Sequence, residues 1–342
     1  MAQTIGSFLG VIIYKIIHAL GKQRIEHNVL CACGISFATG MITFVMWNNT
    51  FGQWLAMIMM GAAYYCTVTS VNVCMIEIID KKNGVELLLG YGFSGVGSFL
   101  APQLTKHFEE KSYLLMSVFY LVMATLCFTF IRPQQKGEKS FNAVDTEKKV
   151  YGSKKLEMMF GLSLFLVLGM GLTTNGWIPS YAVRTGACRK EETSKFSAIY
   201  YTIMMLMRFL SPKVAVSTSR KLSVFLPTML AVGLFCVFCQ CNEFYGAATT
   251  YGSIGYAFSC SLMYPLMMLL PSEYGISFKP AQTANILVWT VFSSGFLSGL
   301  TGTLMRHNIQ LLFYSLITMS TILLCVVLAI IRQMKKEVQK AK

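Results

Sequence analysis

The sequence predicts an all-α polytopic membrane protein with about eleven transmembrane helices, five before and six after one polar segment. Hydrophobic residues make up 54% of the chain and charged residues only 13%, about half the usual charged share of a soluble domain. Apolar stretches of roughly 20 residues, the length that crosses a bilayer as a helix, recur along the chain. Residues 132–155 form the only long polar segment, which predicts two helical bundles joined by a loop.

Short polar turns between the apolar stretches set the expected boundaries. We expect an N-terminal bundle over 1–131, a charged linker over 132–155, a C-terminal bundle over 156–331 and a basic tail over 332–342. The predicted spans cover residues 4–20, 28–47, 54–76, 87–104, 113–131, 156–183, 196–216, 222–241, 245–270, 283–304 and 311–331.

The basic excess of the chain is distributed unevenly between the two sides of the predicted membrane. The formal net charge is +14, and 20 of the 29 Lys and Arg residues fall in loops on the linker's side against 7 on the other. This is the positive-inside pattern, so we expect the linker and the C-terminus to be cytoplasmic. The bilayer is then the expected partner of the basic residues, nucleic acid is not, and the protein is a multi-pass protein of the plasma membrane or an organelle membrane.

Neither enzyme chemistry nor a metal is indicated. Cys31-x-Cys33 and Cys236-x2-Cys239-x-Cys241 have metal-like spacing, but they lie in apolar spans without His, Asp or Glu partners. They are therefore interpreted as small helix-packing residues. No phosphate loop or nucleophile elbow occurs, and the four His residues lie near predicted membrane edges. We expect no enzymatic activity, no cofactor and no metal.

Two predicted spans are rich in small residues, and they lie six spans apart. Small residues spaced three or four apart let helix backbones approach closely in lipid. A six-span offset is typical of paired six-helix halves, which would place one further helix ahead of Met1. The residues expected to pack helices in this way are Gly92, Gly95, Gly97 and Pro102 in the fourth span and Gly295 and Gly299 in the tenth.

Three stretches, taken in chain order, resemble helices of a known transporter family. Its fifth helix is matched by Gly92-Phe93-Ser94-x-Val96-Gly97-x3-Ala101-Pro102, its seventh by Gly169-x-Gly171-x4-Gly176-Trp177-Ile178-Pro179-x-Tyr181-Ala182, and its tenth by Met263-Tyr264-Pro265 with Ser259 before and Glu273 after. The family is the fucose-permease branch of the major facilitator superfamily, which includes the sodium-dependent glucose-transporter-like proteins. The resemblance implies a two-bundle fold that transports a solute.

The resemblance also points to residues that would gate the transport cycle. The stretch containing Gly21, Lys22 and Arg24 falls where the family has a basic loop motif, so the first span matches the family's second helix. The acidic residue of that motif is absent. The family's first helix has no counterpart either, which implies that the gene model is truncated or that the protein has lost a working element. Arg208 lies where the family often has a Gly-Arg pair and is interpreted either as a cytoplasmic gate contact or as a snorkelling charge.

Polar side chains inside the spans are the candidates for solute binding, because they are costly in hydrocarbon unless they face the bundle or a wet cavity. Sugars are recognised by amide and hydroxyl groups together with an aromatic face. The alternative interpretation is interhelical hydrogen bonding and interfacial anchoring. The candidate substrate-binding residues are Tyr65, Asn72, Asn175, Trp177, Tyr256, Tyr264, Gln282, Asn285 and Trp289.

These features favour a transporter that moves a small polar organic solute, a hexose or similar, by alternating access. None of the 15 Asp and Glu residues lies near the middle of a span, and this favours uniport over proton coupling. The alternative is a transport-inactive relative that serves as a scaffold or as a subunit of a membrane complex, with other membrane proteins as partners.

Overall fold

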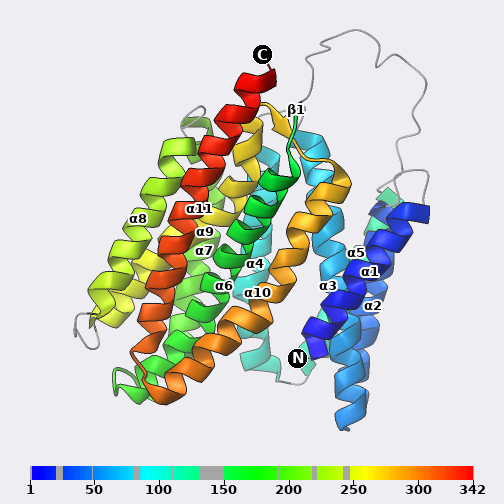
Figure 1. The fold of residues 1–342 in the computed structure, drawn as a ribbon. Coiled ribbons are helices and arrows are strands. Elements are labelled where there is room, and N and C mark those ends of the chain that lie inside the picture. The colour runs from blue at the N-terminus through cyan, green and yellow to red at the C-terminus, as the bar shows by residue number, and fades with distance from the viewer. Residues whose placement is uncertain are drawn as a thin grey trace. The chain divides into compact units, whose positions relative to one another are not determined.

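The protein was analysed as a computed structural model that describes residues 2–20, 26–47, 49–79, 85–109, 111–130, 150–190, 193–217, 222–241 and 247–341. Within these residues the chain forms eleven α-helices and two strands of two residues each (Figure 1). The prediction of an all-α fold with about eleven helices is therefore confirmed.

Five helices precede the linker and six follow it. The first five are α1 (Ala2–Leu20), α2 (Glu26–Met46), α3 (Thr50–Ile79), α4 (Val85–Phe108) and α5 (Lys111–Phe130). The remaining elements are β1 (Val150–Tyr151), α6 (Lys154–Arg184), α7 (Thr193–Ser217), α8 (Leu222–Cys241), α9 (Ala247–Glu273), β2 (Ile276–Ser277), α10 (Pro280–His307) and α11 (Leu311–Ala341).

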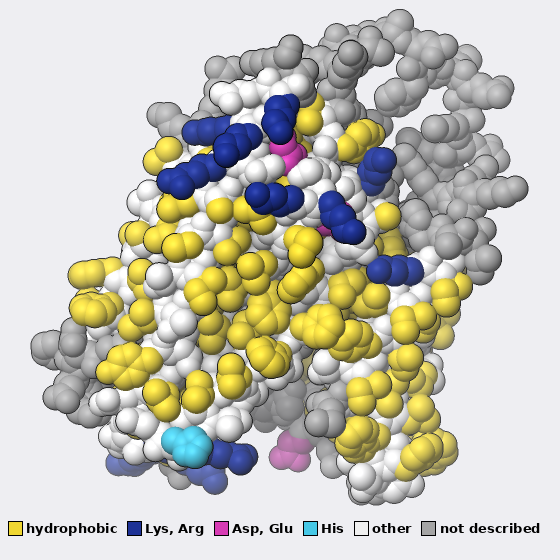
Figure 2. Space-filling view, in the orientation of Figure 1, with side chains coloured by type: hydrophobic (Ala, Val, Ile, Leu, Met, Phe, Trp, Pro, Cys, Tyr) yellow, Lys and Arg dark blue, Asp and Glu magenta, His cyan; other side chains and the backbone are white. Residues whose placement is uncertain are grey.

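Eight of the described helices are long and apolar enough to cross a membrane, and α1 and α7 carry shorter apolar segments. On the face of the second unit seen in Figure 2, hydrophobic side chains cover the middle, while Lys and Arg gather toward the end where α11 finishes. Apolar flanks with charged ends are what a bilayer-spanning bundle requires. The chain is an integral, multi-pass membrane protein.

The described residues form two compact units. Unit 1 comprises residues 1–77, 103–151 and 278–284, and unit 2 comprises residues 78–102, 152–277 and 285–342. The predicted limits of the two bundles, the linker and the tail stay predictions, and residues 132–149 of the linker lie outside the described part of the chain.

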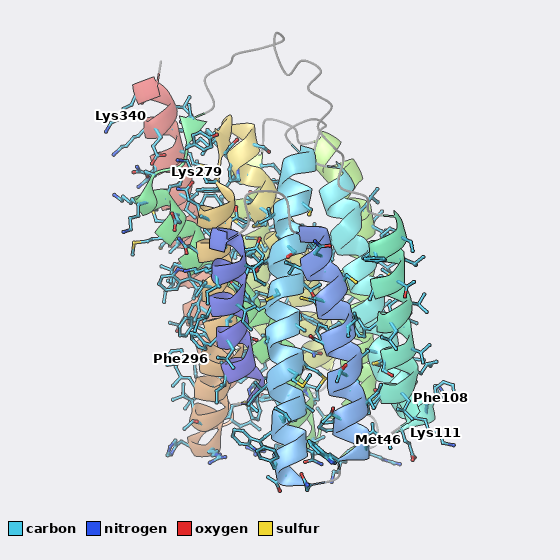
Figure 3. The ribbon with its side chains drawn as sticks, turned by 90° about the vertical axis from the view of Figure 1, so that its right-hand side faces the viewer. Met46, Phe108, Lys111, Lys279, Phe296 and Lys340 are labelled. Atoms are coloured by element: carbon cyan, nitrogen blue, oxygen red, sulfur yellow. The ribbon has the colours of Figure 1, made fainter. Side chains whose placement is uncertain are left out.

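In unit 1, α2 and α5 pack antiparallel at very short range. A Cβ atom added to Gly34 would lie 2.8 Å from the Cβ of Ala124. One turn along, the rings of Phe37 and Tyr120 stack with centroids 4.7 Å apart. Figure 3 places Met46, at the end of α2, at the same end of the unit as the start of α5. Close backbone approach maximises dispersion contacts, which drive helix association in lipid.

Glycines also bring α1 against α3 in unit 1. A Cβ at Gly10 would lie 2.6 Å from the carbonyl oxygen of Ala62. The Ser7 hydroxyl donates to the carbonyl oxygen of Gly61 over 3.1 Å, and the Cys66 thiol donates to that of Gly10 over 3.3 Å. Side-chain hydrogen bonds to a neighbouring helix backbone replace the water that is missing in the bilayer.

In unit 2, the start of α6 is fixed by the end of α11. Ser153 is the N-cap of α6, and its hydroxyl accepts from the Leu156 amide over 3.3 Å. The Glu337 carboxylate accepts from both the amide and the hydroxyl of Ser153, and it also accepts from Gln333. A capped helix start satisfies amides that would otherwise be unpaired. The last turns of α11 therefore serve to hold α6.

We predict that Gly34→Ala lowers the thermal stability of the protein. The added methyl would meet the Cβ of Ala124 and, at 3.1 Å, the backbone oxygen of Tyr120, and such overpacking costs about 1–3 kcal/mol. Gly97→Ala is the matched control, because its Cβ would meet nothing within 4 Å. Melting temperatures in detergent measure both variants. Equal melting temperatures would show that the α2–α5 contact is looser than described.

Candidate functional site

Helices α6 and α10 of unit 2 run parallel with a constant register. The Asn285 amide donates to the Glu157 carboxylate over 2.9 Å, and the Ser293 hydroxyl donates to the carbonyl oxygen of Phe165 over 2.6 Å. In both pairs the α10 residue lies 128 positions after the α6 residue in the sequence. Two helices that keep one offset over eight residues are parallel. This register therefore gives the position of the remaining residues of both helices along the axis.

Trp177 lies toward the far end of this helix pair. Its indole nitrogen donates to the carbonyl oxygen of Ser298 over 2.9 Å and to the Ser298 hydroxyl at 3.2 Å. The ring packs against Gly302, where a Cβ atom would overlap it. The side chain therefore joins α6 to α10, and its role in solute binding stays a prediction.

The candidates at the start of α10 also have partners within the protein. The Trp289 ring packs against Gly161 and meets Phe165 edge-on at 6.4 Å, and 37% of its surface is exposed. The Gln282 side chain accepts from the Lys279 amide over 3.0 Å, the return bond of a capping box. The Gln282 bond stabilises the start of α10, and the Trp289 ring packs α10 against α6. Asn285 adds the hydrogen bond to Glu157.

The α6–α10 register separates the two asparagines that the sequence suggested as a common site. Asn285 lies opposite Glu157, and Asn175 lies 18 residues further along α6. At 1.5 Å per residue this is about 27 Å along the helix axis. One small solute cannot contact both side chains at once, so a site in unit 2 can include only one of them.

Asn175 instead meets α7 beside an aromatic pair. Its amide nitrogen donates to the Tyr201 hydroxyl over 2.7 Å, while its buried side-chain oxygen has no hydrogen-bond partner in the described residues. The rings of Tyr200 and Tyr201 meet edge-on with centroids 5.7 Å apart. The buried Tyr200 hydroxyl faces Gly171 and likewise has no partner there.

Helix α9 extends this group on the other side. Tyr256 is 1% exposed, and its hydroxyl lies beside Cys260 and Ser320. Tyr200 also interacts electrostatically with Cys260. The hydroxyls of Thr173 and Ser259 are also buried without a hydrogen-bond partner in the described part of the chain, but Ser259 lies against Gly233 of α8, and Thr173 lies one turn from Gly169, which faces α10. The α6–α7–α9 cluster consists of Asn175, Tyr200, Tyr201, Tyr256 and Cys260.

The unpaired polar atoms set this cluster apart from ordinary helix packing. A buried hydroxyl or amide without a partner costs roughly 1–3 kcal/mol, so native proteins pair nearly all of them. Here the atoms without a partner among the described residues come from three helices: Asn175 on α6, Tyr200 on α7 and Tyr256 on α9. Water or a polar ligand would remove the cost, so the α6–α7–α9 cluster is the best candidate site in unit 2.

Arg208 extends the polar region along α7, about two turns from Tyr200. Its guanidinium donates to the carbonyl oxygens of Ser261 on α9 and Tyr91 on α4, each at 3.4 Å. Tyr91 in turn meets Tyr264 edge-on at 5.3 Å. The arginine thus reaches toward main-chain oxygens of two neighbouring helices. Whether it also gates the transport cycle stays a prediction.

The two candidates on α3, Tyr65 and Asn72, are both buried in unit 1. The Tyr65 hydroxyl donates to the carbonyl oxygen of Ala284 over 3.0 Å, and the Asn72 amide donates to that of Val68 in its own helix over 2.7 Å. Their role in solute binding stays a prediction. The predicted gating residues Gly21, Lys22 and Arg24 lie outside the described residues.

The small residues expected to pack helices differ in their surroundings. In unit 2, a Cβ at Gly92 would lie 3.0 Å from the Phe209 ring, and one at Gly95 would lie 3.0 Å from the Cα of Met205. Gly97 and Gly299 have open space at that position, and Gly295 is exposed. Pro102 lies within α4, and its side chain is outside the described part.

Sequence reasoning missed the two tyrosines of α7. Tyr200 and Tyr201 are adjacent inside the predicted span 196–216. Polar aromatic residues within a span indicate a buried polar site as well as the amides among the candidate residues do. Glu157 was also missed as the partner of Asn285, because it lies 128 residues away in the sequence.

No protein-family model matches the sequence, and no curated protein matches it. Solved structures do match. A major facilitator superfamily transporter, FucP, in the outward conformation has a TM-score of 0.72 at 13% identity, over 97% of this chain and 87% of that one. This chain therefore has the major facilitator fold, as predicted.

Two further structures share this fold. A variant of the E. coli fucose:proton symporter FucP matches with a TM-score of 0.71 at 12% identity, over 97% of this chain and 88% of that one. The human organic anion transporter MFSD10 (TETRAN) matches with a TM-score of 0.73 at 11% identity, over 95% and 83%. The predicted resemblance to the fucose-permease branch is confirmed at the level of the fold.

We predict that Trp177→Phe lowers the melting temperature more than Trp289→Phe. The first change removes the indole hydrogen bond to the Ser298 main chain, worth about 1 kcal/mol. The Trp289 indole makes no hydrogen bond within the described residues, so its replacement serves as the control. Thermal unfolding of both variants measures the difference. A larger loss in the Trp289 variant would contradict the assignment of Trp177 to helix packing.

Proposed function

We propose that this protein is a membrane transporter that moves a small polar organic solute, a hexose or similar, by alternating access and without a coupling ion. The observation that carries the proposal is the α6–α7–α9 cluster: buried hydroxyl and amide groups without partners, in a chain with the major facilitator fold. In such a fold the transported solute binds near the middle of the membrane, among the helices of the bundles.

The chemistry of the cluster suits a neutral polyhydroxylated solute. The Asn175 side-chain oxygen can accept a hydrogen bond, and the hydroxyls of Tyr200 and Tyr256 can both donate and accept. The tyrosine rings of α7 add an apolar face of the kind that sugars contact. A sugar would pair these groups with its own hydroxyls and so remove the cost of leaving them buried and unpaired.

The structural neighbours agree with this solute class without deciding it. Two of them are fucose transporters and one is an organic anion transporter. Arg208 interacts electrostatically with Tyr200, so an anionic solute would find a positive charge next to the cluster. The cluster itself contains hydroxyl, amide and thiol groups, and these favour the neutral sugar over the organic anion.

The distribution of acidic residues supports uniport. A proton-coupled carrier needs a carboxylate that titrates inside the membrane during the cycle. Glu157 lies in the first turn of α6, and Glu273 ends α9. Neither belongs to the α6–α7–α9 cluster. The basic residues of the linker and of the end of α11 favour a cytoplasmic location for these two segments.

We predict that Tyr201→Phe reduces hexose uptake at least tenfold, because the change removes the hydroxyl that holds Asn175 and leaves its amide misplaced. Tyr314→Phe is the matched control, since it removes a hydroxyl from an exposed tyrosine of α11. Uptake of labelled hexoses into liposomes that contain purified protein measures both. Equal uptake by the two variants would remove the cluster from the site.

Uniport has its own signature. We predict that hexose counterflow is unchanged, within twofold, when an inward proton gradient is imposed or collapsed, because no titrating carboxylate takes part. The measurement is the initial rate of counterflow with and without a protonophore. A rate that follows the proton gradient would contradict uniport while leaving transport intact.

The scaffold remains the alternative function. It is favoured if the reconstituted protein melts cooperatively, which shows that it is folded, and yet moves neither labelled hexoses nor organic anions. Transport of organic anions but not of hexoses would support the transporter function and exclude a neutral solute.

A further inference from the structure

Helix α2 directs two thiols at two different neighbours in unit 1. Cys31 and Cys33 are two residues apart, so they lie about 200° apart around the helix. Cys33 is buried in hydrogen-bond contact with the Cys66 thiol of α3, whereas Cys31 lies beside Cys127 of α5, with which it interacts electrostatically. All four residues are free cysteines.

The register of α2 and α5 places Cys31 and Cys127 on facing surfaces. Gly34 faces Ala124, and the added Cβ of the glycine would lie 2.8 Å from that of the alanine. Residue 31 lies one turn before Gly34, and residue 127 lies one turn after Ala124. In an antiparallel pair these two positions therefore face each other. The close approach one turn away, at Gly34 and Ala124, brings the two backbones near enough here for a disulfide, which needs Cβ atoms about 3.5–4.5 Å apart.

The two pairs differ in how deeply they are buried within unit 1. Cys31 and Cys127 are half-exposed, whereas Cys33 and Cys66 are buried. Cys127 lies three residues before α5 ends at Phe130, about 4.5 Å along the axis. The outer pair therefore lies within about one turn of the end of α5, where a small oxidant reaches it more easily than it reaches the buried pair. The buried pair provides an internal comparison.

We propose that Cys31 and Cys127 are a peroxide-sensitive thiol pair that closes reversibly into a disulfide. One thiolate attacks a peroxide oxygen, the O–O bond breaks, and a sulfenic acid and hydroxide form. The second thiol attacks the sulfenic sulfur, the S–S bond forms, and water leaves with the remaining proton. In sum, two thiols and hydrogen peroxide give one disulfide and two waters. Two molecules of a small thiol reductant reverse the reaction.

The disulfide would tie α5 to α2 at the end of α5 from which the chain continues into the linker. Both cysteines belong to unit 1, so the bond stiffens that unit internally. The proposal depends on the helix packing of unit 1 and not on transport, so it stands or falls independently of the proposed function.

The test uses the full-length protein in lipid nanodiscs with a protease site inserted between residues 80 and 84, which separate Cys31 from Cys127 in the sequence. After treatment with hydrogen peroxide and cleavage, we expect the two fragments to migrate as one band on a denaturing gel without reductant and as two after reduction. Cys127→Ser and Cys31→Ser should each give two bands. Cys33→Ser is the control and should still give one.

A second measurement uses the chain without the inserted site. Mass spectrometry after peroxide treatment and digestion should find the linked peptide that joins Cys31 to Cys127, in at least tenfold higher yield than in protein oxidised after unfolding. Separate fragments from folded wild-type protein would overturn the proposal. The proposal would also be overturned if the two protease fragments remained joined in the Cys127→Ser variant, or if folded and unfolded protein gave equal yields of the linked peptide.

Discussion

The structure depends on one constraint: inside a bilayer, each polar group must find its partner within the protein. This requirement explains why α1 and α10 send hydroxyls to the backbone oxygens of their neighbours, as Ser7 does to Gly61 and Ser293 does to Phe165. It also gives meaning to the exceptions. The polar atoms of α6, α7 and α9 that lack partners among the described residues, including the Asn175 oxygen and the Tyr200 hydroxyl, are the groups that the proposed solute would pair.

Under the proposed function, helix packing and solute recognition would use different residues of the same types. Trp177, Trp289 and Asn285 join α6 to α10, so this helix pair is fixed along its length. Asn175 lies on α6 as well, but its amide bonds to Tyr201 on α7. In the proposed transporter, a rigid pair next to a partly unsatisfied group would give the solute both a stable support and free hydrogen-bonding capacity.

Much of the fold could be predicted from the sequence, because span length and hydropathy are local properties. The apolar stretches became helices near the expected boundaries, and the family pattern around Trp177 indicated the fold that the structural matches then showed. The site was less accessible. Asn285 and Asn175 are both amides within spans, and only the α6–α10 register, set by pairs 128 residues apart, shows that about 27 Å separate them. A sequence shows residue types, whereas partners depend on register.

The most direct measurement of the central claim is a cryo-electron microscopy structure of the protein with a bound hexose. The account predicts solute density within hydrogen-bond distance of Asn175 and the α7 tyrosines, so that the buried oxygen and hydroxyl gain partners. Density for the solute at the start of α10 near Asn285, or an α6–α7–α9 cluster whose polar atoms remain closed off from the bound solute, would contradict it.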